Sequence, residues 1–413
     1  MPKLAIVVPE YRTREAPGGG LAAVADFVAD ALGGDSVPVH ERWDVRIVAP
    51  RMSHAAPEHA SLLRPRSIVR GVLAARRPDG DRAVWDVGTV MPEVEANRYR
   101  PRRALTELVD ACDAAVVIAG TPAIGCVMRD VRVPWVLKVA SLVEEERAAR
   151  LADTPGARGF LLRRATASTA HLDRRALQLP DAVVTLNGSM ADRLAELTSR
   201  PVRLLPMGVD TDRFRPADVR AHDGPIVMVS RLNDPRKDVP TLLRAYAVAR
   251  RDHDVTNRLV LAGRHGLPAA HRAMIDALGL RNDVDVVAAP SDADLAALLR
   301  TASVFALASR EEGLGVVFLE AMAAGLPVVT TATRGAEHAV PALAGVHVPF
   351  GAAIVDDLAR AVAEVLHDRP RADAMGRSGR AHVDTTYALH VAARRWRDLV
   401  SSLAAGRSSG VAR

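Results

Sequence analysis

Short apolar runs alternate with longer segments of helical periodicity along the whole chain. The runs have the length of buried strands and are almost continuously apolar, which is typical of parallel sheets covered by helices on both faces. Two sets of such runs predict an α/β protein with two Rossmann-like domains. The expected strands are 4–8, 45–49, 114–120, 134–140 and 181–186 in the first half, and 226–230, 258–263, 284–288, 304–308 and 327–331 in the second.

The alternation is interrupted near residue 205, where prolines and glycines punctuate the segment PMGVDTDRFRP. We therefore predict an N-terminal domain at 1–205 and a C-terminal domain at 206–384. Residues 385–403 carry an apolar stripe at helical spacing, and we expect this helix to follow the second domain and pack back on the first. The remaining residues, 404–413, are predicted to form a disordered tail.

Composition agrees with two globular domains and narrows the class of partner. The chain has 413 residues, of which 49% are hydrophobic and 25% charged, enough for two cores. Its net charge of +6 suits an anionic small ligand, and also a weak attraction to an acidic membrane surface. Nucleic acid is disfavoured, because the basic residues are scattered and only 3% of residues are aromatic.

The cysteines and the apolar segments favour a cytoplasmic protein without a metal site. Cys112 and Cys126 have neither a CxxC partner nor a nearby His pair, so we interpret them as reduced, buried thiols. The apolar run at the N-terminus ends at Pro9 after the length of a strand, which does not match a signal peptide. The longest apolar stretch, 313–332, is interrupted by Glu320 and does not match a membrane span.

The segment REEGLGVVFLEAMAAGLPVV, residues 310–329, holds two glutamates eight positions apart, Glu312 and Glu320. Glu320 lies inside a predicted buried helix, where an unpaired carboxylate costs several kcal/mol, on the order of a lost buried hydrogen bond or more. A carboxylate accepts two hydrogen bonds side by side, which matches a vicinal diol such as a ribose. The pair spans about 12 Å at roughly 1.5 Å per residue, about the length of a sugar joined to a nucleoside by two phosphates. The alternatives are a helix-dipole partner for Glu312, a role that Glu311 also fits, and a buried ion pair for Glu320.

Two further features point to an anion. Arg231 leaves an expected strand and Lys237 precedes a helix that Pro240 helps to start, an arrangement suited to a phosphate at the carboxyl end of a parallel strand. The glycine run 18–20 lies between the first strand and the next helix, where bare backbone N–H groups bind phosphates. The alternative for the glycine run is a flexible turn. The alternative for the cations is a surface loop of solvated basic side chains, which fits Arg236 better than Arg231 or Lys237.

Three other patterns are interpreted as structural. Ser141 and Glu144 have the spacing of a capping box, and we favour a capped helix over an acidic acceptor-binding patch. The basic segment 158–177 is favoured as a solvated helix over a contact with an anionic membrane or an acidic glycan. The three DxD patterns belong to a linker, a helix end and the approach to a strand, so we assign them no metal; they start at Asp210, Asp252 and Asp283.

The motifs PMGVDTDRFRP, VSRLNDPRKDV and EEGLGVVFLEAMAAGLPVV together resemble the family 4 retaining glycosyltransferases of the GT-B fold. The resemblance is dense from residue 202 to about residue 350 and thin in the first half of the chain. It implies two Rossmann-like domains whose parallel sheets face across a cleft. The C-terminal domain would hold a nucleotide-sugar donor and the N-terminal domain the acceptor.

The resemblance also implies roles for individual residues. Glu320 would bind the ribose, and Glu312 would hold the donor sugar together with the backbone of Gly313, Leu314, Gly315 and Val316. Arg231 and Lys237 would bind the diphosphate, with Gly19 or Gly20 approaching it from the other domain. Arg231, Lys237 and Glu312 are therefore the expected catalytic residues. Ala140 and Ser141 stand where many members carry a His, and no other His follows before His171, so none is assigned.

The expected activity is transfer of a hexose from a UDP- or GDP-linked donor, with retention, to a hydroxyl of a small molecule, glycan or lipid. The family usually works without a metal, and we expect no cofactor here. Two alternatives remain open: a catalytically silent binder of nucleotide sugars, and a GT-B enzyme of different chemistry, such as an epimerase or a C–N-coupling pseudo-glycosyltransferase.

Overall fold

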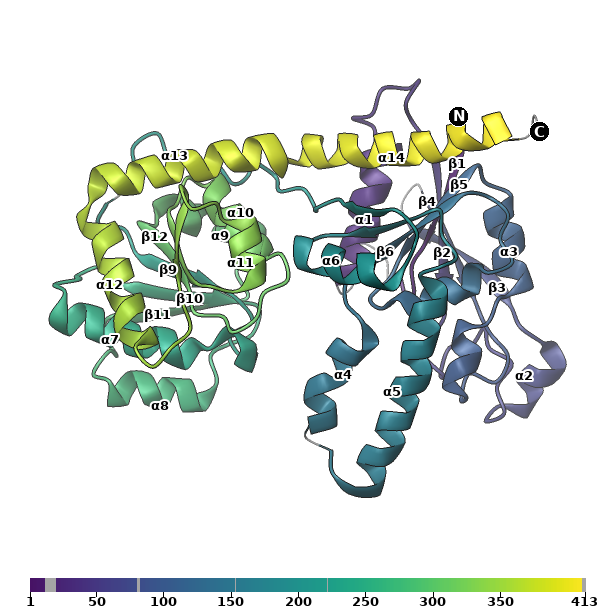
Figure 1. Cartoon of the computed structure of the whole chain (residues 1–413), viewed down its shortest axis with the longest axis horizontal. Helices are drawn as coiled ribbons and strands as arrows, with labels where there is room; N and C mark the ends of the chain where they lie inside the picture. Colours follow the sequence, from purple (N-terminus) through teal and green to yellow (C-terminus); the bar gives the residue numbers. More distant parts are fainter. Residues whose placement is uncertain (12–19, 80–81, 153, 221, 411–413) are drawn as a thin grey trace. The chain divides into compact units, whose positions relative to one another are not determined.

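The chain divides into two compact units, each with its own sheet (Figure 1). Unit 1 comprises Met1–Pro206 and Ala393–Arg413, and unit 2 comprises Met207–Ala392. The computed structural model describes residues 1–11, 20–79, 82–152, 154–220 and 222–410. Both sheets are parallel, apart from one antiparallel pair in unit 1, so the predicted class of two Rossmann-like α/β domains is confirmed.

The sheet of unit 1 has eight strands in the order β3-β4-β2-β1-β5-β6-β7-β8, and only the edge pair β3–β4 is antiparallel. Its strands are β1 Lys3–Val7, β2 Asp44–Pro50, β3 Ala74–Asp79, β4 Arg82–Val87, β5 Ala114–Ile118, β6 Trp135–Val139, β7 Ala182–Thr185 and β8 Val202–Leu204. Its helices are α1 Gly20–Gly33, α2 Pro65–Arg70, η1 Glu95–Tyr99, α3 Arg103–Asp110, η2 Pro122–Met128, α4 Val143–Ala152, α5 Gly156–Ala176, α6 Gly188–Leu197 and α14 Leu389–Gly410.

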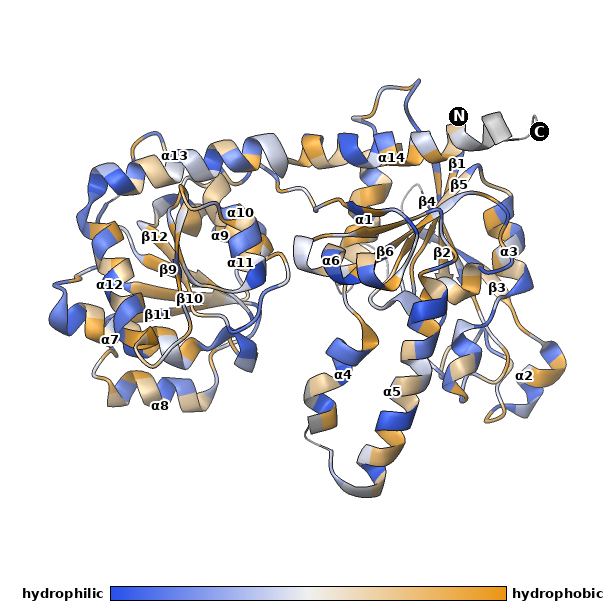
Figure 2. Ribbon diagram, in the orientation of Figure 1, coloured by the Kyte–Doolittle hydropathy of each residue, from blue (hydrophilic) through white to orange (hydrophobic). Residues whose placement is uncertain are grey.

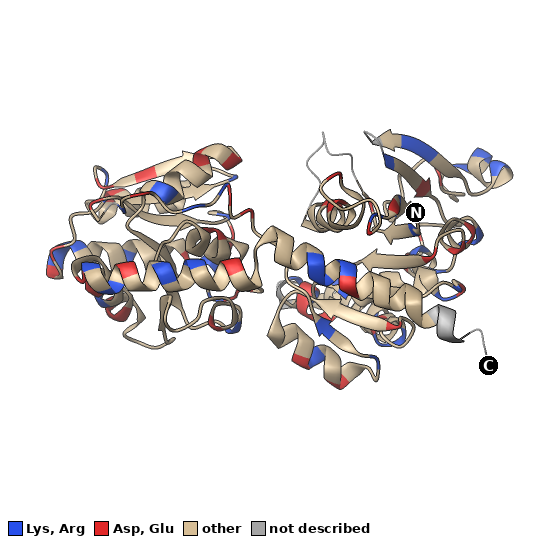
Figure 3. Ribbon diagram, turned by 90° about the horizontal axis from the view of Figure 1, so that it is seen from above, with Lys and Arg blue, Asp and Glu red and all other residues tan. Residues whose placement is uncertain are grey.

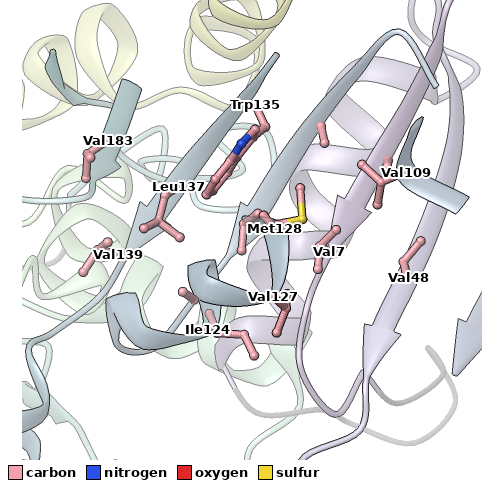
Figure 4. Close-up of a cluster of buried hydrophobic side chains, with 14 of the residues drawn as sticks. Val7, Val48, Val109, Ile124, Val127, Met128, Trp135, Leu137, Val139 and Val183 are labelled. Atoms are coloured by element: carbon pink, nitrogen blue, oxygen red, sulfur yellow. The ribbon is translucent and has the colours of Figure 1, made fainter. Parts of the chain in front are cut away.

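The core of unit 1 follows from the period of two along each strand. In β6, Trp135, Leu137 and Val139 lie in one buried cluster, while the residues between them point to the other face. Figure 4 shows these side chains near η2, with Val183 of the adjacent strand β7 on one side and Val7 and Val48 of β1 and β2 farther along the sheet. The strands are accordingly apolar along their length in Figure 2, as expected of a sheet covered on both faces.

The sheet of unit 2 has six strands, all paired in parallel, in the order β11-β10-β9-β12-β13-β14. Its strands are β9 Ile226–Val229, β10 Leu259–Gly263, β11 Val284–Ala288, β12 Val304–Leu307, β13 Val328–Thr331 and β14 Gly345–Val348. Its helices are η3 Pro235–Lys237, α7 Val239–Asp252, α8 Ala269–Ala277, α9 Asp292–Thr301, α10 Val316–Ala323, α11 Arg334–Ala339, α12 Ile354–His367 and α13 Arg369–Thr386. A fully parallel sheet places the carboxyl ends of all its strands on one edge.

All ten expected strands are present, and four more were missed. β3 and β4 form a charged edge hairpin, AARRPD and RAVWDV, which lacks a continuous apolar run. β8 is only three residues long, and β14 reads GVHV. Edge position and shortness remove the hydrophobic signal on which the prediction depends.

The C-terminal helix differs from its predicted extent. α13 runs to Thr386, and α14 begins only at Leu389, because Val209 pairs with the backbone of the intervening residues. α14 also continues to Gly410, beyond residue 403, where a disordered tail was expected. Within unit 1, Arg397 Nη1 donates to the carbonyl of Ala31 at 3.1 Å, so α14 lies against the end of α1.

The capping box predicted at Ser141 and Glu144 is wrong. The Ser141 hydroxyl lies 3.5 Å from the carbonyl of Gly120, and Asp173 from α5 caps the start of α4 instead. Asp173 Oδ2 accepts from the N–H of Val143 at 3.0 Å, and Oδ1 accepts from the N–H of Ala123 at 2.7 Å. The side chain is 3% exposed, and this burial raises its pKa to about 6.

The two cysteines were expected to be reduced, buried thiols. Both cysteines are free; Cys112 is buried and Cys126 only partly so.

In the part of the chain that the structure describes, no helix has the length and apolarity needed to cross a bilayer. Figure 3 shows Lys and Arg residues interspersed with Asp and Glu residues along both units.

Replacing Asp173 tests its role as a tertiary helix cap. Asp173→Ala should lower the free energy of unfolding of unit 1 by about 2 kcal/mol or more, since two buried N–H groups lose their acceptor. All four tryptophans lie in unit 1, at positions 43, 85, 135 and 396, so tryptophan fluorescence during urea denaturation reports that unit alone. Asp130→Ala, at an exposed aspartate, is the control and should leave the transition unchanged. Equal midpoints for the two variants would contradict the capping role.

Candidate functional site

The predicted site residues of unit 2 come from two neighbouring strands. Arg231 and Lys237 follow β9, whereas Glu312 follows β12, and β9 pairs directly with β12 in the sheet. Because the strands are parallel, both loops leave the same edge, which is where ligands bind in sheets of this kind. The structure joins Lys237 to Glu312 and places Arg231 on the same loop as Lys237.

Lys237 and Glu312 form the centre of this arrangement. Lys237 Nζ lies 2.5 Å from Glu312 Oε1, and the two side chains are only 14% and 6% exposed. The Ser309 hydroxyl donates to the same oxygen at 2.8 Å. Lys237, predicted to meet a diphosphate, thus contacts a carboxylate, and Glu312 is a buried ion-pair partner rather than a helix-dipole partner.

Arg231 is placed differently from Lys237. Its side chain is 61% exposed and lies 2.8 Å from Asp234. Asp234 also accepts from Arg236 at 2.9 Å, and this hydrogen bond is the main reason why the pKa of Asp234 is lowered. One carboxylate therefore aligns two arginines at the carboxyl end of β9, and Arg231 can turn toward a ligand without leaving a buried charge behind.

A second set of contacts joins the two loops, and sequence reasoning missed it. Asp238 has a left-handed backbone, with φ of 41°, and caps the start of α7. Its carboxylate also accepts from Arg310 at 2.8 Å, while the N–H of Arg310 donates to the carbonyl of Arg236 at 2.7 Å. An aspartate two residues before Pro240 and three before Thr241 carries a recognisable capping signal, but its bond to Arg310 depends on tertiary contact.

The segment between the glutamates requires glycine. Gly315 has φ of 65°, and a Cβ added there would lie 2.4 Å from the Phe318 ring. A Cβ at Gly335, on α11, would lie 2.2 Å from the carbonyl oxygen of Glu312, so backbone packs closely on this loop from behind. No side chain caps the start of α10, which leaves its first N–H groups available for an anion. Leu314 is buried at 6% exposure and anchors the loop.

Glu320 has no side-chain hydrogen bond or ion pair among the described residues. It lies on α10 between buried neighbours, and burial raises its pKa to about 7, with the charge of Asp292 adding to the rise and that of Arg213 opposing it. The ion pair considered as an alternative is absent from the described residues, because Arg213 binds Asp292 at 2.7 Å instead. A half-neutral carboxyl in an apolar helix lacks the hydrogen bonds that a ligand diol would donate.

The remaining predicted positions lie elsewhere. Gly20 opens α1 in unit 1, and a Cβ there would meet no atom of the described residues within 4 Å. Gly18 and Gly19 lie outside the described residues. Across the described ranges, no group of three or more His, Cys, Asp or Glu side chains could hold a metal ion. Most of the DxD aspartates have structural partners: Asp210 caps a turn, and Asp252, Asp283 and Asp285 contact arginines.

Comparison with known proteins identifies a family domain within unit 2. Residues 210–382 match the family described as Glycosyl transferases group 1. A GDP-mannose-dependent alpha-(1-6)-phosphatidylinositol monomannoside mannosyltransferase from Mycobacterium tuberculosis is 37% identical over 221 residues, covering 48% of this chain and 54% of that protein. An MMP alpha-(1->4)-mannosyltransferase from Mycolicibacterium hassiacum is 32% identical, covering 48% of each. The chain thus spans about half the length of the curated relatives that it matches.

Solved structures resemble the whole chain in fold. Sucrose-phosphate synthase from Thermosynechococcus elongatus has a TM-score of 0.69 at 18% identity, covering 98% of this chain and all of that one. WaaG, a glycosyltransferase involved in lipopolysaccharide biosynthesis, has a TM-score of 0.60, also at 18% identity, covering 96% of this chain and 99% of that one. The resemblance predicted from the motifs is confirmed: the chain has the GT-B fold and carries, at residues 210–382, a domain of the glycosyltransferase group 1 family, of the family 4 type.

Proposed function

We propose that the chain is a retaining, metal-independent glycosyltransferase that moves mannose from GDP-mannose to a hydroxyl of a lipid-borne acceptor. The observation that carries the proposal is Glu320, a carboxyl without a partner among the described residues, on the helix that follows the Lys237–Glu312 pair. GDP-mannose is favoured as donor because it appears in the names of several relatives, and a lipid acceptor because those enzymes act on phosphatidylinositol monomannoside or a diphosphopolyprenol.

Each donor group has a matching residue. Glu320 would accept hydrogen bonds from the ribose hydroxyls. Glu312 would accept from a sugar hydroxyl, helped by the uncapped N–H groups at the start of α10. Arg231 and Lys237 would bind the diphosphate. Because Lys237 contacts Glu312, a diphosphate that binds Lys237 must share or replace that contact.

Breaking the bond between the sugar and the diphosphate increases negative charge on the leaving phosphate. Cations placed beside that charge lower the barrier, since their attraction grows in the transition state. Arg231 and Lys237 are suited to this role. We infer no protein nucleophile: the leaving phosphate would help to take the proton of the acceptor hydroxyl on the same face of the sugar, which retains its configuration.

Titration of GDP-mannose against pH tests the role of Glu320. Its raised pKa means that the carboxyl is protonated below about pH 7, while binding a diol requires the carboxylate. Affinity should therefore rise about tenfold from roughly pH 6 to pH 8 in isothermal calorimetry. Glu320→Gln should bind more weakly at the higher pH and lose this dependence, whereas Glu364→Gln, on the exposed side of α12, should keep it. The same slope in all three proteins would remove the ribose role.

Arg231 and Arg236 offer a matched pair for the catalytic proposal, because both are exposed and both bind Asp234. With GDP-mannose and phosphatidylinositol monomannoside, Arg231→Ala should slow GDP release by about 100-fold, since transition-state charge loses a partner. Arg236→Ala should stay within about threefold of the unchanged protein. Equal losses would assign the effect to the shared loop and not to Arg231.

The two alternatives give different outcomes in the same assay. A silent binding partner would bind GDP-mannose and release no GDP with any hydroxyl acceptor. An enzyme of different chemistry would release GDP, or rearrange the sugar, without forming a glycosidic bond that retains the donor configuration. Product analysis by NMR of the anomeric carbon separates these outcomes from the proposed transfer.

We also propose that unit 1 rests on an anionic membrane, as a lipid-borne acceptor requires. The support is the apolar surface around α2, formed by Leu62, Leu63, Ile68, Val69 and Val72, in which Leu63 and Val69 are 72% and 91% exposed. Three arginines, at positions 64, 66 and 70, alternate with these side chains. Figure 2 shows the apolar residues gathered at α2. Exposed apolar side chains beside cations are typical of interfacial binding.

Sedimentation with vesicles tests this surface. The chain should bind vesicles of phosphatidylglycerol and phosphatidylcholine, and the double variant Leu63→Ser/Val69→Ser should bind at least about tenfold more weakly because the buried apolar area is lost. Leu343→Ser removes a leucine of similar exposure, 77%, in unit 2 and should have no effect. Unchanged sedimentation of the double variant would exclude the α2 surface.

A further inference from the structure

Unit 2 contains a pocket, of about 630 Å³, which the proposed reaction does not use. Its wall is formed by the segment before β9, the residues just before β12 and β13, and one side of α13. We call it the amino-edge pocket, and the residues that matter to its chemistry are Arg220, His222, Arg300, Asp373, Arg377 and Arg380.

The amino-edge pocket lies at the opposite edge of the sheet from the candidate donor site. Ala302 and Leu326, which line it, precede β12 and β13, whereas Glu312 follows β12. The strands are parallel, so these residues are separated by the length of the sheet, roughly 13 Å for four residues at about 3.3 Å each. A molecule bound in one place does not occupy the other.

The cations of this pocket outnumber the acids available to them. Asp373 is already engaged, by Arg220 at 3.2 Å and by His222 at 3.6 Å, and Asp384 is bound by Arg380 at 2.8 Å. Arg300 and Arg377 have no acidic partner among the described residues.

The carboxylate of Asp218, at the exposed rim, is the one lining acid without a cation among the described residues. Arg220 adds an unsatisfied hydrogen-bond donor, because its Nε is buried and has no hydrogen-bond partner in the described part of the chain. The pocket therefore favours a ligand with a negatively charged hydrogen-bond acceptor.

The walls of the pocket are fixed before any ligand arrives. Arg380 Nη1 donates to the carbonyls of Thr211, Phe214 and Ala323, at 3.1, 3.1 and 2.9 Å, and so ties the segment before β9 to α10 and α13. A Cβ at Gly376 would lie 2.1 Å from the carbonyl oxygen of Gly325, which shows how closely α13 packs there. A cavity with rigid walls loses little entropy when it binds a small molecule.

We propose that the amino-edge pocket is a binding site for a small organic anion that carries a phosphate or a carboxylate group. Arg300 and Arg377 bind the anionic group, and the cavity accepts a body the size of a monosaccharide beside it. Phosphate and carboxylate groups both present paired oxygens to a guanidinium, so an experiment is needed to distinguish between them.

Calorimetry on the full chain tests the site with three probes of one carbon skeleton: glucose 6-phosphate, gluconate and uncharged glucose. Saturating GDP is present throughout, so that a phosphate cannot enter the candidate donor site. The expected result is binding of at least one charged probe and none of glucose. The charged probe that binds more tightly identifies the anionic group.

Three arginine variants provide the specificity test. Arg300→Ala and Arg377→Ala should each weaken binding of the charged probe at least about fivefold, because each removes a charged hydrogen-bond donor. Arg369→Ala, at an exposed arginine on α13 outside the pocket, is the control and should bind as the unchanged chain does.

Equal binding of glucose, unchanged affinity in both pocket variants, or no binding of either anion at millimolar concentration would each overturn the proposal. A failure of GDP itself to bind would instead tell against the proposed donor. The pocket can then be measured without GDP, in the Arg231→Ala variant.

Discussion

The ion pair between Lys237 and Glu312 is the constraint on which the candidate site depends. Both side chains are almost fully buried, and each would carry an uncompensated charge without the other. The pair joins the loop after β9 to the loop after β12, and the contact of Arg310 with Asp238 joins the same loops a second time. A donor that binds here therefore meets loops already in place, and its diphosphate enters a network whose charges are balanced beforehand.

Asp173 and Glu320 both have a pKa raised by burial, but they differ in their hydrogen bonds. Asp173 is buried and has a raised pKa, yet it accepts from two backbone N–H groups and joins η2 to α4. Glu320 has a raised pKa for the same reason, burial, and the described residues offer it no donor. Burial and pKa alone do not separate a structural residue from a ligand-binding one. The presence or absence of a hydrogen-bond partner does.

The sequence predicted what depends on local pattern and failed where tertiary contact decides. Continuous apolar runs located ten strands, because both faces of a central parallel strand are buried; the charged hairpin β3–β4 gave no such signal. The glutamate pair and the two cations were found because charged residues are conspicuous beside glycine and apolar neighbours. The contacts of Ser309, Asp234 and Asp238 were missed, since each joins residues far apart along the chain or turns a side chain in a way that spacing does not fix. The supposed capping box at Ser141 failed for the same reason: a distant aspartate supplied the acceptor.

The order of the chain has a consequence for how the molecule is made. Unit 1 contains the first 206 residues and the last helix, so unit 2 is inserted within it. Trp396, which is 1% exposed, and Val400, which is fully buried, belong to the core of unit 1 but are synthesised after all of unit 2. During translation unit 2 can complete its sheet as a continuous stretch, while unit 1 waits with an open apolar face until α14 leaves the ribosome. A chain truncated shortly before α14 would thus retain every residue of the candidate donor site and still lack a finished first unit.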